Sequence, residues 1–106
     1  MSQSQTEQDK KHEDVLECIV EKLIATGKYR KIETHVEYNC RGLNGELDIV
    51  ATPFEGRKEY WEVKGQDNPA SFKRAQVQFR RLEHAFPHKY AYFYATLTRV
   101  VQATPY

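Results

Sequence analysis

Residues 45–65 read GELDIVATPFEGRKEYWEVKG, and this stretch decides the fold because apolar and polar side chains alternate in it twice. A period of two is the pattern of a β-strand, so ELDIVA and EYWEVKG are predicted to be neighbouring strands. The proline and glycine of TPFEGR between them favour a hairpin turn. If the two strands pair, Asp48 of the first can lie opposite Glu62 and Lys64 of the second.

The same alternation assigns each side chain of the two strands to a face. The first strand is expected to divide its side chains into Leu47, Ile49 and Ala51 on one face and Glu46, Asp48 and Val50 on the other. The second strand is expected to divide them into Trp61 and Val63 on one face and Tyr60, Glu62 and Lys64 on the other. Same-face residues of a strand are roughly 6.6 Å apart, so Glu62 and Lys64 should project side by side.

Hydrophobic spacing predicts the elements on either side of this hairpin. Apolar residues recur in steps of three and four over residues 13–26, which predicts an amphipathic helix. Residues 31–38 alternate with a period of two and predict a strand, and the turn residues NCRGLNG follow. Asn68 and Pro69 are a helix opening, and the helix is expected to run to about Phe86.

The end of the chain contains an alternating aromatic strand, KYAYFYATL, and a further short strand in TRVVQA. The order α-β-β-β-α-β favours an α/β fold with a mixed central sheet and a helix on each side. The aromatic side chains are expected in the core or at a dimer face rather than as platforms for stacking bases.

Length and composition indicate one folded domain. The 106 residues suffice for one modest core, and 40% apolar with 29% charged residues is typical of a folded protein. The opening MSQSQTEQDKK is polar, so residues 1–11 are expected to form a flexible tail before a single domain at 12–106. The net charge of +1 gives no overall field for nucleic acid, so any basic surface must be local.

Cysteine spacing and hydropathy favour a cytoplasmic protein without a membrane segment. Cys18 and Cys40 lack CxxC spacing and a companion histidine cluster, which favours reduced thiols over a zinc site. We see neither an apolar run near the roughly 18 residues of a membrane span nor the hydrophobic segment of a signal peptide.

Two carboxylates and an ammonium flanked by apolar residues are costly to bring together unless they bind something. Mg²⁺ fits, because it takes one or two protein carboxylates and fills its other positions with waters and phosphate oxygens. A lysine beside such a metal can orient the attacking water, help to deprotonate it, or neutralise charge on the phosphate. The alternative is a surface salt bridge between Glu62 and Lys64 with Asp48 solvated, but the apolar context and the helices before and after favour a site.

GELDIVA followed by EVK resembles the motif of the PD-(D/E)xK nuclease superfamily, and the αβββαβ order resembles its restriction-endonuclease-like core. The chain looks most like the small Holliday-junction-resolvase-like nucleases, whose second strand often reads G-E-[IL]-D. The resemblance implies that Asp48, Glu62 and the backbone carbonyl of Val63 ligate Mg²⁺, for which Mn²⁺ can substitute. It also implies that Lys64 is the catalytic lysine. Leu47 stands where the namesake proline would be.

The two helices add further candidates, which the same resemblance suggests. At about 100° per residue, Glu17 lies at the edge of the apolar stripe of the first helix, next to Ile24, and is a candidate acid for the site. Glu13 lies on the same margin, and Glu46 is a candidate helper. Gln76 lies beside the stripe of the second helix and is a candidate for orienting substrate. The basic residues expected to grip DNA phosphates are Arg41, Lys73, Arg74, Arg80 and Arg81. Ordinary solvated side chains remain the alternative for these positions.

The predicted function is a Mg²⁺-dependent endodeoxyribonuclease, a hydrolase acting on branched or repair-intermediate DNA in recombination or repair. Because a junction enzyme makes two symmetric cuts, a homodimer is expected. One alternative is a linear-DNA endonuclease of restriction, viral or mobile-element type. Another is a non-catalytic DNA-binding or assembly module with a nuclease fold, and RNA is left open as a substrate.

Overall fold

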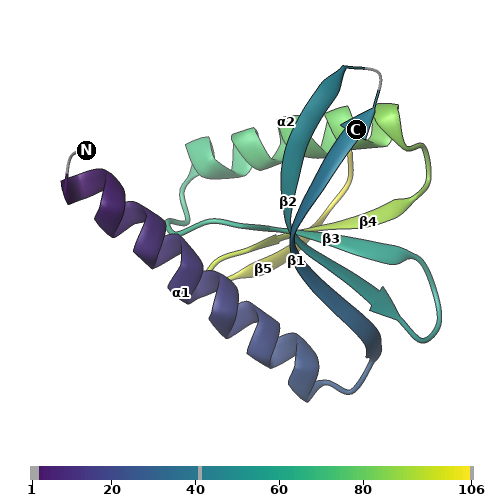
Figure 1. Cartoon of the computed structure of the whole chain (residues 1–106), viewed down its shortest axis with the longest axis horizontal. Coiled ribbons are helices and arrows are strands. Elements are labelled where there is room, and N and C mark those ends of the chain that lie inside the picture. The colour runs from purple at the N-terminus through teal and green to yellow at the C-terminus, as the bar shows by residue number, and fades with distance from the viewer. Residues whose placement is uncertain (1–2, 41, 106) are drawn as a thin grey trace.

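The computed structural model describes residues 3–40 and 42–105 and has an α/β fold around one mixed sheet (Figure 1). Its elements are α1 (Gln3–Ala25), β1 (Tyr29–Cys40), β2 (Leu43–Pro53), β3 (Lys58–Val63), α2 (Pro69–Ala85), β4 (Tyr90–Ala95) and β5 (Val100–Ala103). The strand order is β1-β2-β3-β4-β5, with β3 and β4 parallel and the other neighbours antiparallel. The α/β class, the mixed sheet and the short final strand are confirmed.

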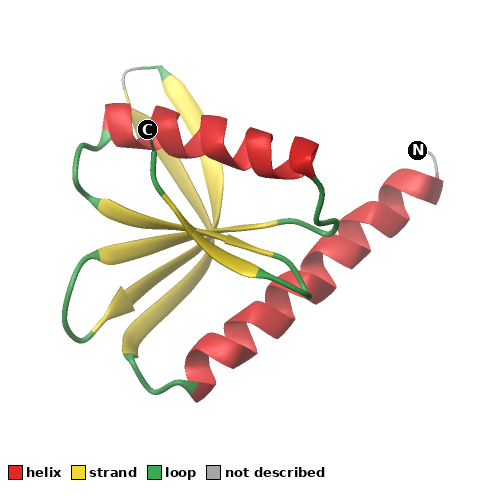
Figure 2. Cartoon of the chain, turned by 180° about the vertical axis from the view of Figure 1, so that it is seen from behind, coloured by secondary structure: helices red, strands yellow, loops and turns green. Residues whose placement is uncertain are grey.

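The two helices cover opposite faces of the sheet, and each forms its own core cluster (Figure 2). On one face α1 packs with Val15, Leu16, Ile19 and Leu23 against side chains of β2 and β3 that include Ile49 and Trp61. On the other face α2 packs with Ala75, Phe79 and Leu82 against Tyr60 and the tyrosines of β4. Burying a large apolar side chain contributes about 1.5–3 kcal/mol, so these two layers stabilise the fold. Tyr90, Tyr92 and Tyr94 are therefore core residues, as predicted.

Helix α1 begins at Gln3, well before the predicted start at residue 13. The segment TEQDKKHED contains good helix formers and neither glycine nor proline, so nothing in it stops the helix. Residues 3–11 are thus helical and continuous with the domain, and their flexibility stays a prediction. The helix ends before Gly27, which has φ +68°, a conformation that favours glycine. Ile24 is 62% exposed, so the buried stripe of α1 is narrower than the sequence pattern indicated.

Helix α2 begins as the sequence predicted. The side chain of Asn68 accepts a hydrogen bond from the Ser71 N–H at 2.9 Å, and Pro69 occupies the first turn, where its missing N–H costs nothing. The helix ends at Ala85, one residue before the predicted end. This cap places the start of α2 directly after the loop that leaves β3.

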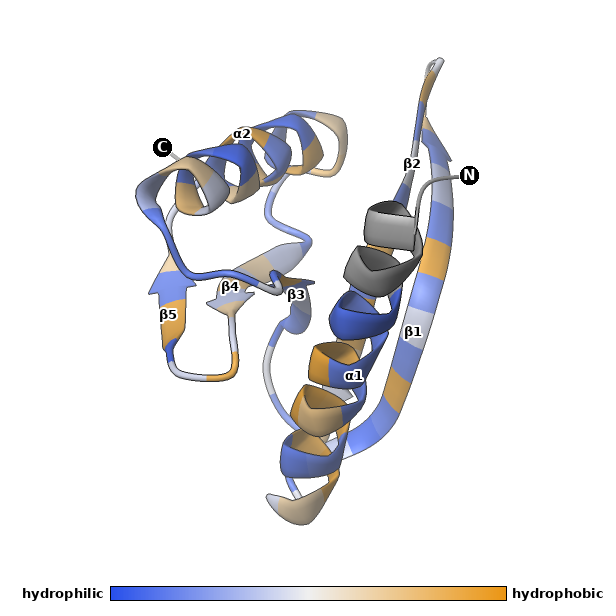
Figure 3. Ribbon diagram, turned by 90° about the vertical axis from the view of Figure 1, so that its left-hand side faces the viewer, coloured by the Kyte–Doolittle hydropathy of each residue, from blue (hydrophilic) through white to orange (hydrophobic). Residues whose placement is uncertain are grey.

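Strands β1 and β2 pair over their whole length, whereas β2 and β3 pair only between Ile49–Ala51 and residues 59–61. The part of β2 that precedes Ile49 therefore pairs with β1 alone, and the two strands leave the sheet as a two-stranded ribbon. This ribbon rises past α2 in Figure 1. Hydrophobic and hydrophilic residues alternate along β1 in Figure 3, as predicted. The separation of β2 from β3 creates a fork at this edge of the sheet.

The ribbon exchanges its faces at His35, which has φ +53°. Ile32 packs with α1, whereas Val36 and Leu47 pack with α2, although the pairing register is the same on both sides of His35. The prediction that Leu47 shares a face with Ile49 is therefore wrong. Positive φ is uncommon in residues other than glycine, so the alternation of the sequence does not indicate this exchange.

Tyr38 joins the ribbon to α2 by an aromatic contact and a long hydrogen bond, and it also packs within the ribbon. Tyr38 packs edge-to-face on Phe86, with ring centroids 6.3 Å apart, and its hydroxyl lies 3.5 Å from the side-chain amide of Gln78. The ring also covers Gly45, where an added Cβ would lie 2.6 Å from the Tyr38 hydroxyl. A side chain at residue 45 would therefore require the Tyr38 ring to move from this position.

Within residues 3–40 and 42–105, no helix is both long and apolar enough to cross a membrane. Cys18 and Cys40 are free thiols.

Candidate active site

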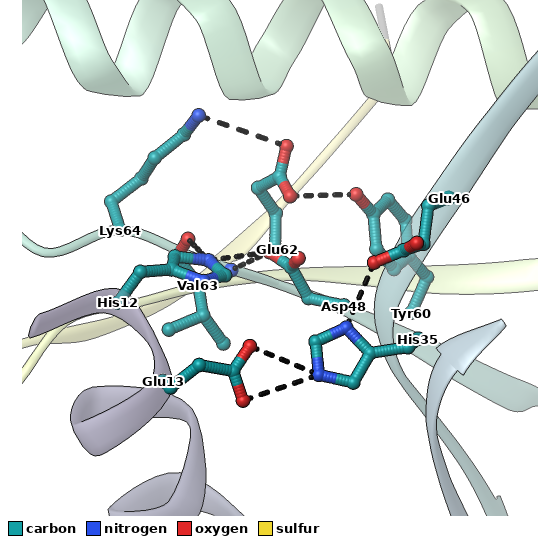
Figure 4. Close-up of polar contacts among 9 residues, drawn as sticks. All are labelled: His12, Glu13, His35, Glu46, Asp48, Tyr60, Glu62, Val63 and Lys64. Atoms are coloured by element: carbon teal, nitrogen blue, oxygen red, sulfur yellow. Dashed lines mark hydrogen bonds and ion pairs between the residues drawn. The ribbon is translucent and has the colours of Figure 1, made fainter. Parts of the chain in front are cut away.

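The fork between β2 and β3 is occupied by the side chain of Asp48 (Figure 4). Its Oδ2 atom accepts a hydrogen bond from the backbone N–H of Val63 at 2.9 Å, so a carboxylate replaces the backbone acceptor that a continuing ladder would supply. The side chain of Asp48 is only 14% exposed. Because β2 and β3 separate here, the Asp48 carboxylate can enter the space between the ends of the two strands.

Glu62 and Lys64 lie beside Asp48 at the end of β3. The Tyr60 hydroxyl donates a 2.8 Å hydrogen bond to Oε1 of Glu62, and Nζ of Lys64 lies 4.0 Å from Oε2. Tyr60 is fully buried between α2 and the sheet, so it fixes the position of that carboxyl. The structure therefore places Asp48, Glu62 and Lys64 close together, as the sequence predicted. It does so at the carboxyl end of the parallel pair β3 and β4, where open α/β sheets usually bind ligands.

His12 of α1 is a fourth side chain at the fork, and the sequence did not predict it. Its Nε2 lies 3.1 Å from the carbonyl oxygen of Val63 and 3.5 Å from Oδ2 of Asp48. A signal was present, because His12 precedes Val15, Leu16 and Ile19 at the spacing of the same helical stripe. Placing the helix start at residue 13 excluded it.

The two carboxyls have opposite protonation preferences. The pKa of Glu62 is raised to about 8. Burial is the largest cause and the neighbouring Asp48 carboxylate the next, and together they outweigh Lys64 and the Tyr60 hydroxyl, which lower this pKa. Burial would also raise the pKa of Asp48, but hydrogen bonds from His12, Glu62 and the Val63 N–H outweigh it and lower the pKa. At neutral pH the pair therefore shares one negative charge, with the proton on Glu62. The pKa of His12 is raised, mainly because its side chain is hydrogen-bonded to Asp48.

The donor set at the fork fits a hard divalent cation. Asp48, Glu62 and the Val63 carbonyl offer oxygen ligands only, and Mg²⁺ needs one or two carboxylates because it keeps several waters. Among the described residues, no group of three His, Cys, Asp or Glu side chains forms a cage for a metal.

Glu17 does not lie at the fork. It is exposed and lines a separate cavity between α1 and β1 of about 390 Å³, together with Glu13 and Glu21. It follows His12 by five residues, about 7.5 Å along the helix, and points elsewhere. Its neighbour on the helical projection, Ile24, is exposed, which is why the projection misplaced Glu17.

Glu13 and Glu46 instead hold His35. The Nδ1 atom of His35 is 2.8 Å from Glu46, and its Nε2 atom is 3.0 Å from Glu13 (Figure 4). The hydrogen bond to Glu46 is the main reason why the pKa of His35 is raised. All three are well exposed, so this triad links α1 to the ribbon at the surface.

Among the described residues, no hydrogen bond or ion pair joins the predicted α2 side chains to Asp48, Glu62 or Lys64. Gln76 is half-buried, and its side chain has no hydrogen-bond partner among residues 10–40 and 42–105. The exposed basic residues of α2 are Lys73, Arg74, Arg80 and Arg81. Arg41 lies outside the described residues. The roles of all these side chains stay predictions.

The chain matches no protein-family model, and no curated protein or solved structure is significantly similar to it. What the site can do is therefore inferred from its own geometry. Two largely buried carboxylates that together carry one charge, a backbone carbonyl in contact with His12 and a lysine form a site that can hold a cation and receive an anion.

Without metal, the protein is expected to lose stability as the pH rises from about 5 to about 8. The pKa of Glu62 is about 8 in the folded state and 4.5 as its ordinary value, so in this window only the folded state keeps the proton. The free energy of unfolding then falls by up to about 1.4 kcal/mol per pH unit. The raised pKa of His12 acts in the same direction, because its contribution is present below pH 6.5 and lost as the pH passes its folded value.

Urea denaturation in EDTA at a series of pH values measures this slope. Glu62→Gln should remove most of it, whereas Glu55→Gln, at an exposed position of the β2–β3 turn, should not. A slope that persists unchanged in Glu62→Gln would show that Glu62 does not hold the proton.

Proposed function

We propose that the protein is a Mg²⁺-dependent endodeoxyribonuclease with a restriction-endonuclease-like core and that the β2–β3 fork is its active site. One observation carries the proposal: Asp48 and Glu62, from two strands, meet at a partly buried sheet edge with Lys64 beside them. Burying two acids side by side is unfavourable for folding alone, since the folded protein must retain a proton to tolerate it. A cation that replaces this proton accounts for the arrangement.

Asp48, Glu62 and the Val63 carbonyl would hold Mg²⁺, which when bound supplies Lewis acidity toward a phosphate oxygen and lowers the pKa of a water. Glu62 would have to lose its proton to hold the ion, so binding would strengthen as the pH rises toward 8. His12, which now contacts the Val63 carbonyl, would have to leave that oxygen free for the ion.

The other side chains orient these groups and balance charge. The Val63 N–H holds one oxygen of Asp48, and the Tyr60 hydroxyl holds one oxygen of Glu62, whose other oxygen faces Lys64. The Lys64 side chain is 28% exposed, so its ammonium can contact a phosphate from solvent. There it neutralises the negative charge that grows on the phosphoryl oxygens during in-line attack by water.

DNA is the proposed substrate because of the charge on α2, and branched or repair-intermediate DNA is preferred by the resemblance of the motif. The exposed Lys73, Arg74, Arg80 and Arg81 provide cations for a phosphate backbone. We further propose a homodimer, since a junction needs two cuts. The aromatic strand β4 is not available for this contact, because it lies inside the sheet and its tyrosines are buried. The edge strand β5, with Val100 53% exposed, is the better surface.

The decisive experiment compares labelled four-way junction, flap, linear duplex and single-stranded DNA with Mg²⁺, Mn²⁺ or EDTA. Cleavage is expected with either metal and should vanish in EDTA. Paired symmetric nicks at the junction would identify the preferred substrate, and equal cutting of linear duplex would favour the restriction or mobile-element alternative. Binding without cutting in every condition would favour the non-catalytic module. Cutting that persists in EDTA would exclude the metal mechanism.

A further inference from the structure

We propose that the cavity between α1 and the start of α2 binds a phosphate group of the nucleic-acid strand, next to the phosphate that reacts at the fork. The cavity has a volume of about 210 Å³ and is lined by Lys11, His12, Lys64, Gly65, Gln66 and Ser71. The assignment rests on the proposed function, which supplies the strand, and it adds a second anchor for that strand.

Charge is the first reason to assign an anion to this cavity. Lys11 reaches it from α1 and Lys64 from the end of β3, and no carboxylate is among its lining residues. Two ammonium groups from different elements around one small space attract a single anion strongly. Pockets for drug-sized ligands measure roughly 300–1,000 Å³, so this cavity suits a group of phosphate size.

Ser71 is the second and independent reason. Ser71 lines the cavity and is only 8% exposed. The Ser71 N–H is already bonded to Asn68, and no hydrogen bond to a described residue engages its hydroxyl. Among the described residues no fully buried side-chain nitrogen or oxygen lacks a partner, so this hydroxyl keeps access to the space of the cavity and can donate to a phosphate oxygen there. The positive end of α2 favours an anion at the same place.

His12 and Lys64 connect this cavity to the fork. Lys64 lies beside Glu62, and Nε2 of His12 faces Asp48 and the Val63 carbonyl, so both residues border the two spaces. The cavity between α1 and β1 is lined by three glutamates and by His35, its one basic side chain, so it would attract a phosphate backbone less. The substrate strand is therefore expected to run from the fork toward the start of α2 and not along β1.

Inorganic phosphate is the probe, titrated in EDTA into the ¹⁵N-labelled protein. The expected result is a saturable shift of the Gly65, Gln66 and Ser71 amide signals. Lys11→Gln should weaken binding about fivefold, the factor for losing one charge contact near a surface. Ser71→Ala should weaken it about threefold, as for one hydrogen bond. Lys10→Gln, which removes the adjacent exposed lysine outside the cavity, should bind phosphate as the wild type does.

A second titration identifies the source of the phosphate. Short single strands with a 5′-phosphate or a 5′-hydroxyl are compared in EDTA. Weaker binding of both strands by Lys11→Gln indicates an internal phosphate, and weaker binding of the phosphorylated strand alone indicates a terminal one. Either result supports the site.

Two results would overturn the inference: no shift of these amides up to saturating phosphate, or equal binding by Lys11→Gln and Lys10→Gln. Because no metal or cleavage enters these measurements, the outcome is separate from that of the nuclease assay. Phosphate binding without Mg²⁺-dependent cleavage would contradict the proposed function alone. Cleavage with unaltered phosphate binding in Lys11→Gln would contradict the cavity alone.

Discussion

Asp48→Asn is expected to lower the rate of Mg²⁺-dependent DNA cleavage by about a thousandfold or more. The substitution removes the only carboxylate at the fork that is ionised without metal, because the neighbouring Glu62 holds its proton until about pH 8. Loss of a metal ligand forfeits several kcal/mol of transition-state stabilisation, and each 1.36 kcal/mol is tenfold in rate. Cleavage of end-labelled DNA under single-turnover conditions, with calorimetric titration of Mg²⁺, measures both consequences.

The asparagine keeps an oxygen that can accept the Val63 N–H, so the fold should survive the change. Thermal unfolding near that of the wild type would establish this point. Asp14→Asn, on the exposed face of α1, is the matched control and should cleave normally. If Asp48→Asn retains more than a tenth of the wild-type rate, the fork is not the active site.

Lys64→Met is expected to lower the cleavage rate by about 10²–10³-fold, the loss seen when one group that stabilises transition-state charge is removed. Methionine retains much of the length of the side chain and deletes its charge. Because the Lys64 charge lowers the pKa of Glu62, the variant should also need a higher pH to bind Mg²⁺. A pH profile of the single-turnover rate reports both effects, as a lower plateau and a midpoint displaced upward.

Lys58→Met is the control for this variant, since Lys58 is exposed at the opposite end of the same strand. It should leave the rate and the profile unchanged. Equal rates for Lys64→Met and Lys58→Met would show that Lys64 serves only as a surface ion-pair partner of Glu62.

The proximity of the fork side chains could be predicted from the sequence because it depends on strand alternation and on one hairpin. Alternation placed Glu62 and Lys64 together, and the hairpin of β2 and β3 brought Asp48 near them, although the two strands pair only as far as Ile49 and Trp61. Such local patterns depend on few residues and little on the rest of the chain. The helix caps at Asn68 and Gly27 were readable for the same reason.

The parts that sequence did not predict depend on tertiary packing. The exchange of faces at His35 requires a positive φ, which a histidine in a strand does not indicate. As a result Leu47 joined the core of α2. His12 was missed because helix boundaries are poorly marked in polar segments, and the same error turned attention to Glu17. The cavity near Ser71 could not be predicted, because it forms between two helices whose relative position no local sequence pattern indicates.

The topology of the sheet also has a consequence for the order in which the chain folds. β1, β2 and β3 are joined by hairpins, whereas β3 pairs with β4 across a separation at which Lys58 meets Tyr90. Closing a short loop costs less entropy than closing a long one, so the hairpins are expected to form first. Asp48 and Glu62 would then meet while water still surrounds them. The cost of removing that water would fall on the later step, when α2 and β4 dock and Tyr60 is buried between them.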